Sequence, residues 1–382
     1  MHEHASSVFG EMSALAIATG SINLGQGFPD TDGPEVIKQA AMQAIADGRG
    51  NQYPPANGLP QLRAAISVHQ QRFYGIEVDP DLQVVVTTGA SEAIAASVLA
   101  FVEAGDEVVM FAPWFDLYAA AISLAGARRV SVPLQGPDFR PDAEALRAAI
   151  TPRTRLLILN SPHNPTGSVF TREELEQIAE VVRDHELIVI SDEAYEHLVF
   201  DGSEHVPFTT LPGMAQRTVT VGSAGKSLSF TGWKVGWATG PTDLIAAVRV
   251  VRQHLSFVSS GPFQWAVAEG LALPDSYWLG FARQLQAQRD ILCNGLAALG
   301  FPVTYPQGTY FATTDVRTMG YRDGWTFCRD LPVRVGVVAI PHEVFHDDRA
   351  NGLPYVRWAF CKRPEVLIAA LERLEPLRLP MR

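Results

Sequence analysis

The sequence predicts an α/β protein with a mostly parallel central sheet and a smaller α+β domain towards its C-terminus. Through the middle of the chain, short apolar runs rich in β-branched residues alternate with helical patterns. Each run is apolar throughout, which is typical of strands buried on both faces of a parallel sheet. The end of the chain combines helices with short strand-like pieces, which is typical of an α+β unit. With 382 residues, the chain exceeds the size at which one core usually stops growing, so we expect more than one unit.

Five apolar runs are the expected strands of the large sheet, and a sixth run follows them as a further candidate. In chain order, the six runs cover residues 84–88, 107–111, 156–160, 187–191, 218–222 and 235–239. One βαβ unit is clear between the third and fourth runs. There, Thr171 and Glu174 match a capping box that opens a helix reaching to about His185. A right-handed crossover of this kind makes its two strands parallel.

The two ends of the chain differ from this middle part. Towards the C-terminus, we expect helices at 277–299 and 364–374 and strand-like pieces around 308–312, 335–340 and 356–360. The first forty-odd residues are loop-rich in pattern, and we expect them to pack as an arm against the small domain or a partner subunit. The expected division is an N-terminal arm with part of the small domain (1–45), a large domain (46–280) and a small C-terminal domain (281–382).

Charge and hydropathy exclude several classes of function. The chain has 30 Lys and Arg against 41 Asp and Glu, which gives a net charge of −11. An acidic chain is a poor binder of nucleic acid, and its charge also disfavours adhesion to an anionic membrane. The longest apolar stretches, such as residues 93–102, are about half of the roughly 20 residues that a membrane-spanning helix needs. We therefore expect small molecules as partners rather than nucleic acids or membranes.

The N-terminus and the cysteines point to a reducing compartment. The first ten residues show no cationic region followed by an apolar one, so we expect no secretory signal and a cytoplasmic protein. Cys293, Cys328 and Cys361 are odd in number and far apart, without a CxxC pattern. We expect them to be packing or surface thiols, with no structural zinc and no other metal.

Candidate functional residues follow the expected strands, because parallel α/β sheets place their sites at the carboxyl ends of strands. After the first run, Ala90 and Ser91 open an alanine-rich helix. Small residues at a helix N-terminus suit a phosphate, although a plain helix cap is the alternative. After the second run comes Phe115, which could stack on a flat ligand or belong to the core.

The next strand ends supply more specific chemistry. Asn164 lies in a loop that two prolines make rigid, and Asp192 and Tyr195 follow the fourth run. An acid at the end of a buried strand is costly unless it meets a cation. After the fifth run, Lys226 is placed to act as a Schiff-base nucleophile, and Lys234 adds a second positive charge.

These residues fit one kind of cofactor together. The glycines are not spaced as GxGxxG, and no acidic residue follows at the usual distance, so we reject a dinucleotide. An aldehyde cofactor that carries a phosphate, a phenolic oxygen and a pyridine nitrogen would use every one of the candidates. Pyridoxal 5′-phosphate is such a cofactor.

Four motifs, in this order and spacing, resemble those of the fold-type I, class I/II aminotransferases, which depend on pyridoxal phosphate. They are SPHNPTG, DEAY, SAGK and TGWKVGW. Three others, INLGQGFPD, NQYPP and YVRWAFCKR, together with the lysine of TGWKVGW, resemble the kynurenine/glutamine/methionine aminotransferase branch and, within it, the bacterial N-succinyldiaminopimelate aminotransferases. The resemblance covers essentially the whole chain. It implies the transferase fold type I, a large domain with a mostly parallel sheet plus a small α+β domain.

The resemblance implies a role for each candidate residue. Lys226 would bind the cofactor covalently and move the α-proton, Asp192 would pair with the pyridine nitrogen, and Tyr195 would hydrogen-bond the phenolic oxygen. Asn164 would bind that oxygen and also face the substrate, and Phe115 would stack on the ring. The phosphate would be bound by Ala90, Ser91, Ser223 and Lys234.

Three further residues would complete the site according to the same resemblance. Tyr53 would reach the phosphate in the neighbouring subunit, which implies a homodimer with shared sites. Arg357 would bind the α-carboxylate of the substrate, and Gly27 would line the same pocket. Many members of the superfamily carry Arg where this chain has Lys234, which lacks the planar guanidinium. No second arginine for a dicarboxylate is recognisable, and we expect Arg252 to lie on a solvated helix face, so a specific aspartate aminotransferase is doubtful.

The implied activity is transfer of an amino group from an amino acid to a 2-oxo acid, with 2-oxoglutarate as the expected acceptor. The donor stays open between N-succinyl-LL-2,6-diaminopimelate, kynurenine, glutamine, methionine and aromatic amino acids. A cysteine-S-conjugate β-lyase of the same fold is the first alternative. A cofactor-binding regulatory protein and an α/β enzyme without pyridoxal phosphate are the others.

Overall fold

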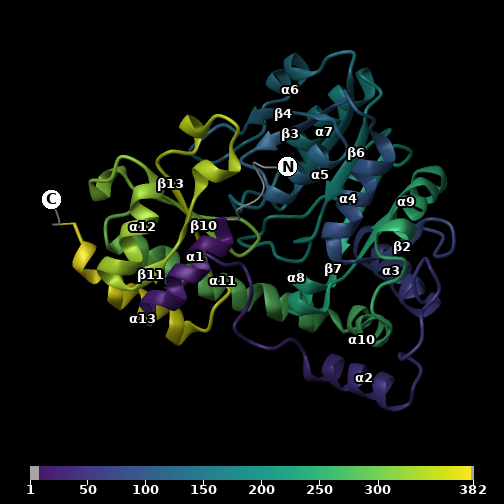
Figure 1. Ribbon diagram of the computed structural model, residues 1–382, viewed down its shortest axis with the longest axis horizontal. Coiled ribbons are helices and arrows are strands. Elements are labelled where there is room, and N and C mark those ends of the chain that lie inside the picture. Colours follow the sequence, from purple (N-terminus) through teal and green to yellow (C-terminus); the bar gives the residue numbers. More distant parts are fainter. Residues whose placement is uncertain (1–7, 380–382) are drawn as a thin grey trace.

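A seven-stranded sheet forms the centre of the larger part of the protein in the computed structural model, which describes residues 8–379 (Figure 1). Only β8 runs antiparallel to its neighbours in this sheet, so the carboxyl ends of the other six strands meet at one edge. The strand order is β2 (Val84–Thr88), β8 (Val235–Thr239), β7 (Thr218–Ser223), β6 (Ile188–Asp192), β5 (Thr154–Asn160), β3 (Glu107–Ala112) and β4 (Arg128–Pro133).

All six strands predicted from the sequence are present, with ends that differ by at most two residues. The sequence missed the edge strand β4, which begins with two arginines and is only partly buried. An edge strand has one free side, so its apolar pattern is interrupted and gives a weaker signal. The predicted mostly parallel α/β architecture is confirmed.

Helices cover both faces of this sheet, which explains why its strands are apolar throughout. Alternate residues of β3 show the arrangement: Val108 and Met110 belong to one core cluster, and Val109 and Phe111 to another. The first cluster includes residues of α4 (Gly89–Phe101), α5 (Asp116–Leu124) and α9 (Thr242–Leu255), and the second includes α6 (Ala143–Ala149) and α7 (Arg172–Asp184). At the start of α7, Thr171 and Glu174 form the predicted capping box.

A four-stranded antiparallel sheet organises the smaller part, at the left of Figure 1. Its order is β12 (Ile340–Pro341), β13 (Tyr355–Ala359), β10 (Phe311–Asp315) and β9 (Val303–Thr304). α11 (Asp275–Ala298) and α12 (Gly324–Val335) pack against it, and α13 (Pro364–Leu374) packs on α11. The helices predicted at 277–299 and 364–374 are confirmed. The strand expected from residue 335 is wrong at its start, because Val335 still belongs to α12 and Gly336 ends that helix in a left-handed conformation.

The N-terminal segment is more regular than its sequence pattern indicates. It holds two helices, α1 (Val8–Thr19) and α2 (Glu35–Ala46), where we expected mainly loops. In α1, half of the residues are glycine, alanine, serine or threonine, so the apolar periodicity that reveals a helix is weak there. α1 packs on α12, and β1 (Ile22–Asn23) pairs in parallel with β11 (Val337–Val338).

The prediction for Arg252 on α9 is also wrong. Its side chain is only 1% exposed, and Nη1 donates to the carbonyl oxygens of Ala56 and Phe257. Nε lies 3.7 Å from a carboxylate oxygen of Glu92, which is itself nearly buried. Arg252 therefore ties three segments together from inside the fold, a role that its helical spacing does not reveal.

Two smaller features concern the thiols and the hydropathy of the helices. The cysteines Cys293, Cys328 and Cys361 are all free and buried. Among residues 8–379, no helix combines the length and the apolar character that crossing a membrane requires.

The remaining helices of the large part are α3 (Pro60–Tyr74), α8 (Ala224–Ser227) and α10 (Gly261–Leu271).

Candidate active site

A cavity of about 300 Å³ lies at the carboxyl edge of the large sheet, where the smaller part of the protein meets it. Its lining draws on the ends of several strands of the large sheet and on β10 and β13 of the smaller sheet. The structure brings nearly all the predicted site residues together there: Gly27, Ala90, Ser91, Phe115, Asn164, Asp192, Tyr195, Ser223, Lys226, Lys234 and Arg357.

One end of the cavity is built to receive an anion. The backbone turns from β2 directly into α4, and Gly89 adopts a left-handed φ of +72° at this turn. Lys234 extends its amino group to 3.3 Å from the hydroxyl oxygen of Ser91. A Cβ on Gly236 would lie 2.5 Å from the backbone nitrogen of Ala90, so only glycine allows this close approach. The N-terminus of α4 and the lysine together present positive charge, which suits a phosphate.

Asp192, the last residue of β6, is buried at the far side of the cavity. Its carboxylate accepts a hydrogen bond of 2.6 Å from the hydroxyl of Tyr118 and one of 3.2 Å from the backbone N–H of Ala194. Neither donor is cationic, and burial raises the pKa of Asp192. A buried carboxylate of this kind is stabilised by a cation beside it. A protonated pyridine nitrogen at this place would provide one, so the residue fits the predicted cofactor.

Lys226 lies in α8, immediately after β7. Its amino group donates a hydrogen bond of 2.9 Å to the hydroxyl of Tyr310, and that hydroxyl donates to the carbonyl oxygen of Gly27 at 2.6 Å. Burial lowers the pKa of Lys226 to about 8. The neutral amine, which is the form that attacks a carbonyl carbon, is therefore far more abundant near neutral pH than in an ordinary lysine.

Arg357 reaches the cavity from β13 of the smaller sheet. Its Nη1 donates to Oδ1 of Asn164 at 3.1 Å, and its Nη2 donates to the carbonyl oxygen of Gly25 at 2.9 Å. The guanidinium carbon lies 4.0 Å from the ring centre of Phe311. Burial lowers the pKa of Arg357 to about 10, which leaves it charged at neutral pH. Within residues 8–379, its buried Nε has no hydrogen-bond partner. The cavity therefore contains a positioned cation suited to a carboxylate.

The sequence reasoning missed three residues of this site. Tyr118 holds Asp192, Tyr310 contacts Lys226 and also hydrogen-bonds to Tyr195, and Thr231 lines the cavity. Tyr118 and Tyr310 do not directly follow a strand of the large sheet, so the rule that located the other candidates passes over them. Thr231 begins the TGWKVGW motif, three residues before the predicted Lys234, so that motif could have indicated it.

Tyr53 does not join the cavity. Its side chain is 80% exposed, and its ring packs edge-on against Phe257 with the ring centres 5.5 Å apart. It is not among the residues that line the cavity with Lys226. Its predicted role towards a neighbouring subunit's site stays a prediction.

The chain matches the family described as aminotransferase class I and II over residues 19–367. It is 49% identical to a Mycobacterium tuberculosis protein described as a probable N-succinyldiaminopimelate aminotransferase DapC, with 99% of this chain and 97% of that protein covered. It is 39% identical to a methionine aminotransferase of Escherichia coli, with 97% and 95% covered. The solved structure of N-succinyldiaminopimelate aminotransferase from M. tuberculosis has a TM-score of 0.96 at 50% identity and 98% coverage of both chains.

The cavity that contains Lys226, Asp192 and Arg357 at the edge of a mostly parallel sheet, together with these matches, identifies the protein as an aminotransferase. The chain belongs to the class I and II aminotransferase family, whose members depend on pyridoxal phosphate. Its fold is that of the fold-type I enzymes, as its sequence predicts. The N-succinyldiaminopimelate, methionine and kynurenine aminotransferases are among its relatives.

Proposed function

We propose that this aminotransferase moves an amino group from N-succinyl-LL-2,6-diaminopimelate to 2-oxoglutarate. The observation that carries the reaction is the convergence of Lys226, Asp192 and Arg357 on one cavity. The donor is supported by the likeness to the M. tuberculosis protein, at 49% identity over almost the whole of both chains.

We propose that pyridoxal phosphate is the cofactor and that the predicted residues hold it. Ala90, Ser91, Ser223 and Lys234 would bind the phosphate, and Phe115 would stack on the ring. Asp192 would bind the ring nitrogen, and Asn164 and Tyr195 would bind the phenolic oxygen. When bound, the cofactor supplies an aldehyde that condenses with amines and a ring that accepts electrons.

The protein's own contribution is to hold the substrate and to move a proton. The guanidinium of Arg357 would bind the α-carboxylate of the amino acid, which places the α-carbon near Nζ of Lys226. That nitrogen would accept the α-proton, and its lowered pKa suits a base that works near neutral pH. Asp192 would keep a proton on the ring nitrogen, because a buried carboxylate favours a cation beside it.

The remainder of the donor must be recognised outside this set of residues. Arg252 is enclosed in the fold with Glu92 and is not free to bind a distal carboxylate.

We propose that the enzyme is a cytoplasmic homodimer in which the exposed Tyr53 serves the partner's site. The relatives that act on methionine or kynurenine support a second candidate, an aminotransferase for such donors.

A donor panel with 2-oxoglutarate tests the proposal. The panel contains N-succinyl-LL-2,6-diaminopimelate, kynurenine, methionine, glutamine and aromatic amino acids, and kcat/KM is measured for each by glutamate formation. The proposal expects the succinylated donor to have the highest kcat/KM. A higher value for methionine or kynurenine would support the second candidate. A Lys226→Ala variant serves as the inactive control for every donor.

A further inference from the structure

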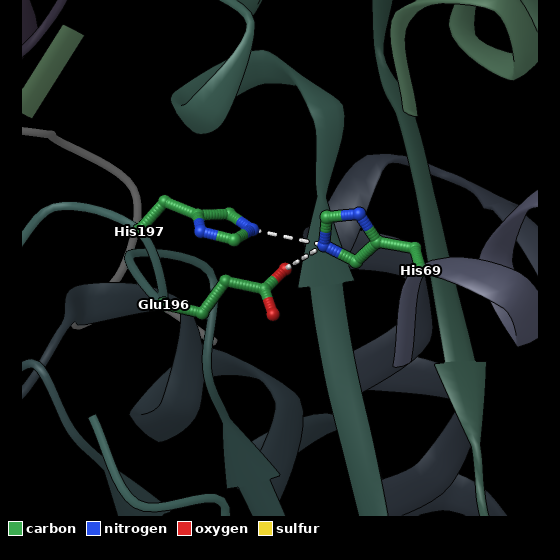
Figure 2. Close-up of side chains that lie close together, drawn as sticks. All are labelled: His69, Glu196 and His197. Carbon is green, nitrogen blue, oxygen red and sulfur yellow. Dashed lines mark hydrogen bonds and ion pairs between the residues drawn. The ribbon is translucent and has the colours of Figure 1, made fainter. Parts of the chain in front are cut away.

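A cluster of two histidines and a glutamate lies outside the cavity just described (Figure 2). His69 belongs to α3, and Glu196 and His197 belong to the turn that follows β6. Nε2 of His69 lies 2.9 Å from Nε2 of His197 and 3.8 Å from Oε1 of Glu196. In Figure 2 the side chains of Glu196 and His197, which come from one turn, point towards that of His69, which comes from another element.

The cluster is enclosed on one side and accessible on the other. The side chain of His69 is only 2% exposed, and that of Glu196 is 11% exposed. Glu196 and His197 line a cavity of about 730 Å³, which gives an ion a route to the cluster. The nearby His205 is engaged elsewhere, because its Nε2 lies 3.0 Å from a carboxylate oxygen of Glu193.

Two imidazole nitrogens face each other at hydrogen-bond distance in this cluster. A hydrogen bond between them requires one nitrogen to offer a lone pair, so at most one of the two facing nitrogens carries a proton. A carboxylate then lies close to the same point. Two imidazole nitrogens and one carboxylate oxygen are a common ligand set of zinc and related divalent ions.

We propose that His69, His197 and Glu196 form a binding site for a divalent transition-metal ion of the zinc type. This proposal replaces our expectation from the sequence that the chain holds no metal, which rested on its cysteines alone. The three ligand atoms all lie within 4.8 Å of one another. Tetrahedral zinc at its usual bond lengths separates its ligand atoms by about 3.4 Å, so small side-chain rotations would suffice.

An ion at this place would connect α3 to the turn that carries the active-site residues. Glu196 directly follows Tyr195, and Asp192 lies four residues before Glu196. Three protein ligands leave a fourth position for water from the cavity. The bound ion would fix the position of this turn from outside the active-site cavity, without contacting the substrate.

The test is a titration of the metal-free holoenzyme, without an affinity tag, with Co²⁺. Cobalt reports a tetrahedral site with imidazole ligands through its visible d–d absorption, and Zn²⁺ then displaces it. The sequence also carries His2 and His4, so the titration is done in a background with both changed to Gln. We expect one equivalent of Co²⁺ per chain and a higher melting temperature with Zn²⁺ than with a chelator.

The variants His69→Gln, His197→Gln and Glu196→Gln should each weaken binding by at least about tenfold, since even changes to residues that only hydrogen-bond to a metal ligand cost about 10–100-fold. His254→Gln, at an exposed position on α9, is the matched control and should bind normally. Circular dichroism and cofactor content verify that each variant is folded. If the parent protein binds no Co²⁺ in a saturable way and gains no thermal stability from Zn²⁺, the proposal is wrong. Unchanged binding in folded His69→Gln or Glu196→Gln protein would also overturn it.

Discussion

Tyr118 donates a hydrogen bond of 2.6 Å to the carboxylate of Asp192, from α5 across to the end of β6. Burial raises the pKa of Asp192, and this hydrogen bond opposes the rise. Tyr118 is thus a positioning residue whose hydrogen bond favours the ionised form of Asp192. Because the proposed pairing with the ring nitrogen needs an anion, the state of Asp192 depends on a residue that no motif identified.

Changing Tyr118 to Phe should therefore move the pKa of Asp192 further upward. A hydrogen bond to a charged group contributes about 1.5–3 kcal/mol, so we expect kcat/KM to fall roughly tenfold or more. The acid limb of the pH–rate profile should shift to higher pH. Tyr305→Phe is the matched control, because it removes a hydroxyl that bonds to Asn294 near the surface. A Tyr118→Phe enzyme with an unchanged pH profile would show that Tyr118 only fills space.

The lowered pKa of Lys226 predicts how the enzyme without cofactor takes up pyridoxal phosphate. Burial disfavours the ammonium form, so the neutral amine accumulates as the pH rises through about 8, rather than through the ordinary value of 10.5. The rate of covalent incorporation, measured after borohydride reduction, should rise with a midpoint near pH 8. Non-covalent binding to Lys226→Ala protein corrects for ionisation of the cofactor itself. A midpoint close to the ordinary lysine value would contradict the burial argument.

Arg357→Lys tests the proposed contact with the α-carboxylate. Lysine keeps the charge but loses the planar pair of N–H donors. We expect the transition state to lose about 1.5–3 kcal/mol of stabilisation, so kcat/KM should fall roughly 10–100-fold for every amino-acid donor. The absorption spectrum of the bound cofactor should stay unchanged. Arg317→Lys, on the exposed surface, is the control.

Two other results would give Arg357 a different role. Loss of bound cofactor from the Arg357→Lys enzyme would indicate that the arginine supports the fold. Loss of activity towards one donor alone would indicate contact with a side chain rather than with the common carboxylate.

Subunit mixing tests the proposed role of Tyr53. Lys226→Ala protein should be inactive, and so should a Tyr53 variant chosen to abolish activity. After the two are mixed and subunits have exchanged, heterodimers should regain activity, because one of their two sites then has both Lys226 and Tyr53. If the mixture stays inactive after verified exchange, Lys226 and Tyr53 of the same chain serve one site, and the proposed sharing between subunits is wrong. An active enzyme with the solution mass of a monomer would also contradict the proposal.

The sequence predicted the parts of the molecule that depend on local pattern. The strands of the large sheet are continuous apolar runs, and the capping box at Thr171 is a short-range signal, so both could be read directly. Because parallel strands end at one edge, the residues that follow them could be placed together from the sequence alone. Only Tyr53, which the resemblance assigned to a partner's site, lies outside the resulting cavity.

Contacts between distant segments could not be predicted in this way. Arg252 has ordinary spacing for a solvated helix face, yet its side chain is buried and contacts Ala56 and Glu92 from other segments. Tyr310 reaches Lys226 from a segment 84 residues away, and His69 meets His197 across 128 residues. Such pairs depend on how the elements pack, and one sequence carries no local mark of that packing.

A single-turnover experiment tests directly whether the enzyme takes an amino group from the proposed donor. The holoenzyme is incubated with N-succinyl-LL-2,6-diaminopimelate in the absence of any 2-oxo acid, and the products are quantified. We expect one equivalent of the 2-oxo product per site, no free ammonia, and an amino group that stays on the enzyme until 2-oxoglutarate accepts it and becomes glutamate. Release of ammonia in step with the product, or no 2-oxo product from this donor, would contradict the account.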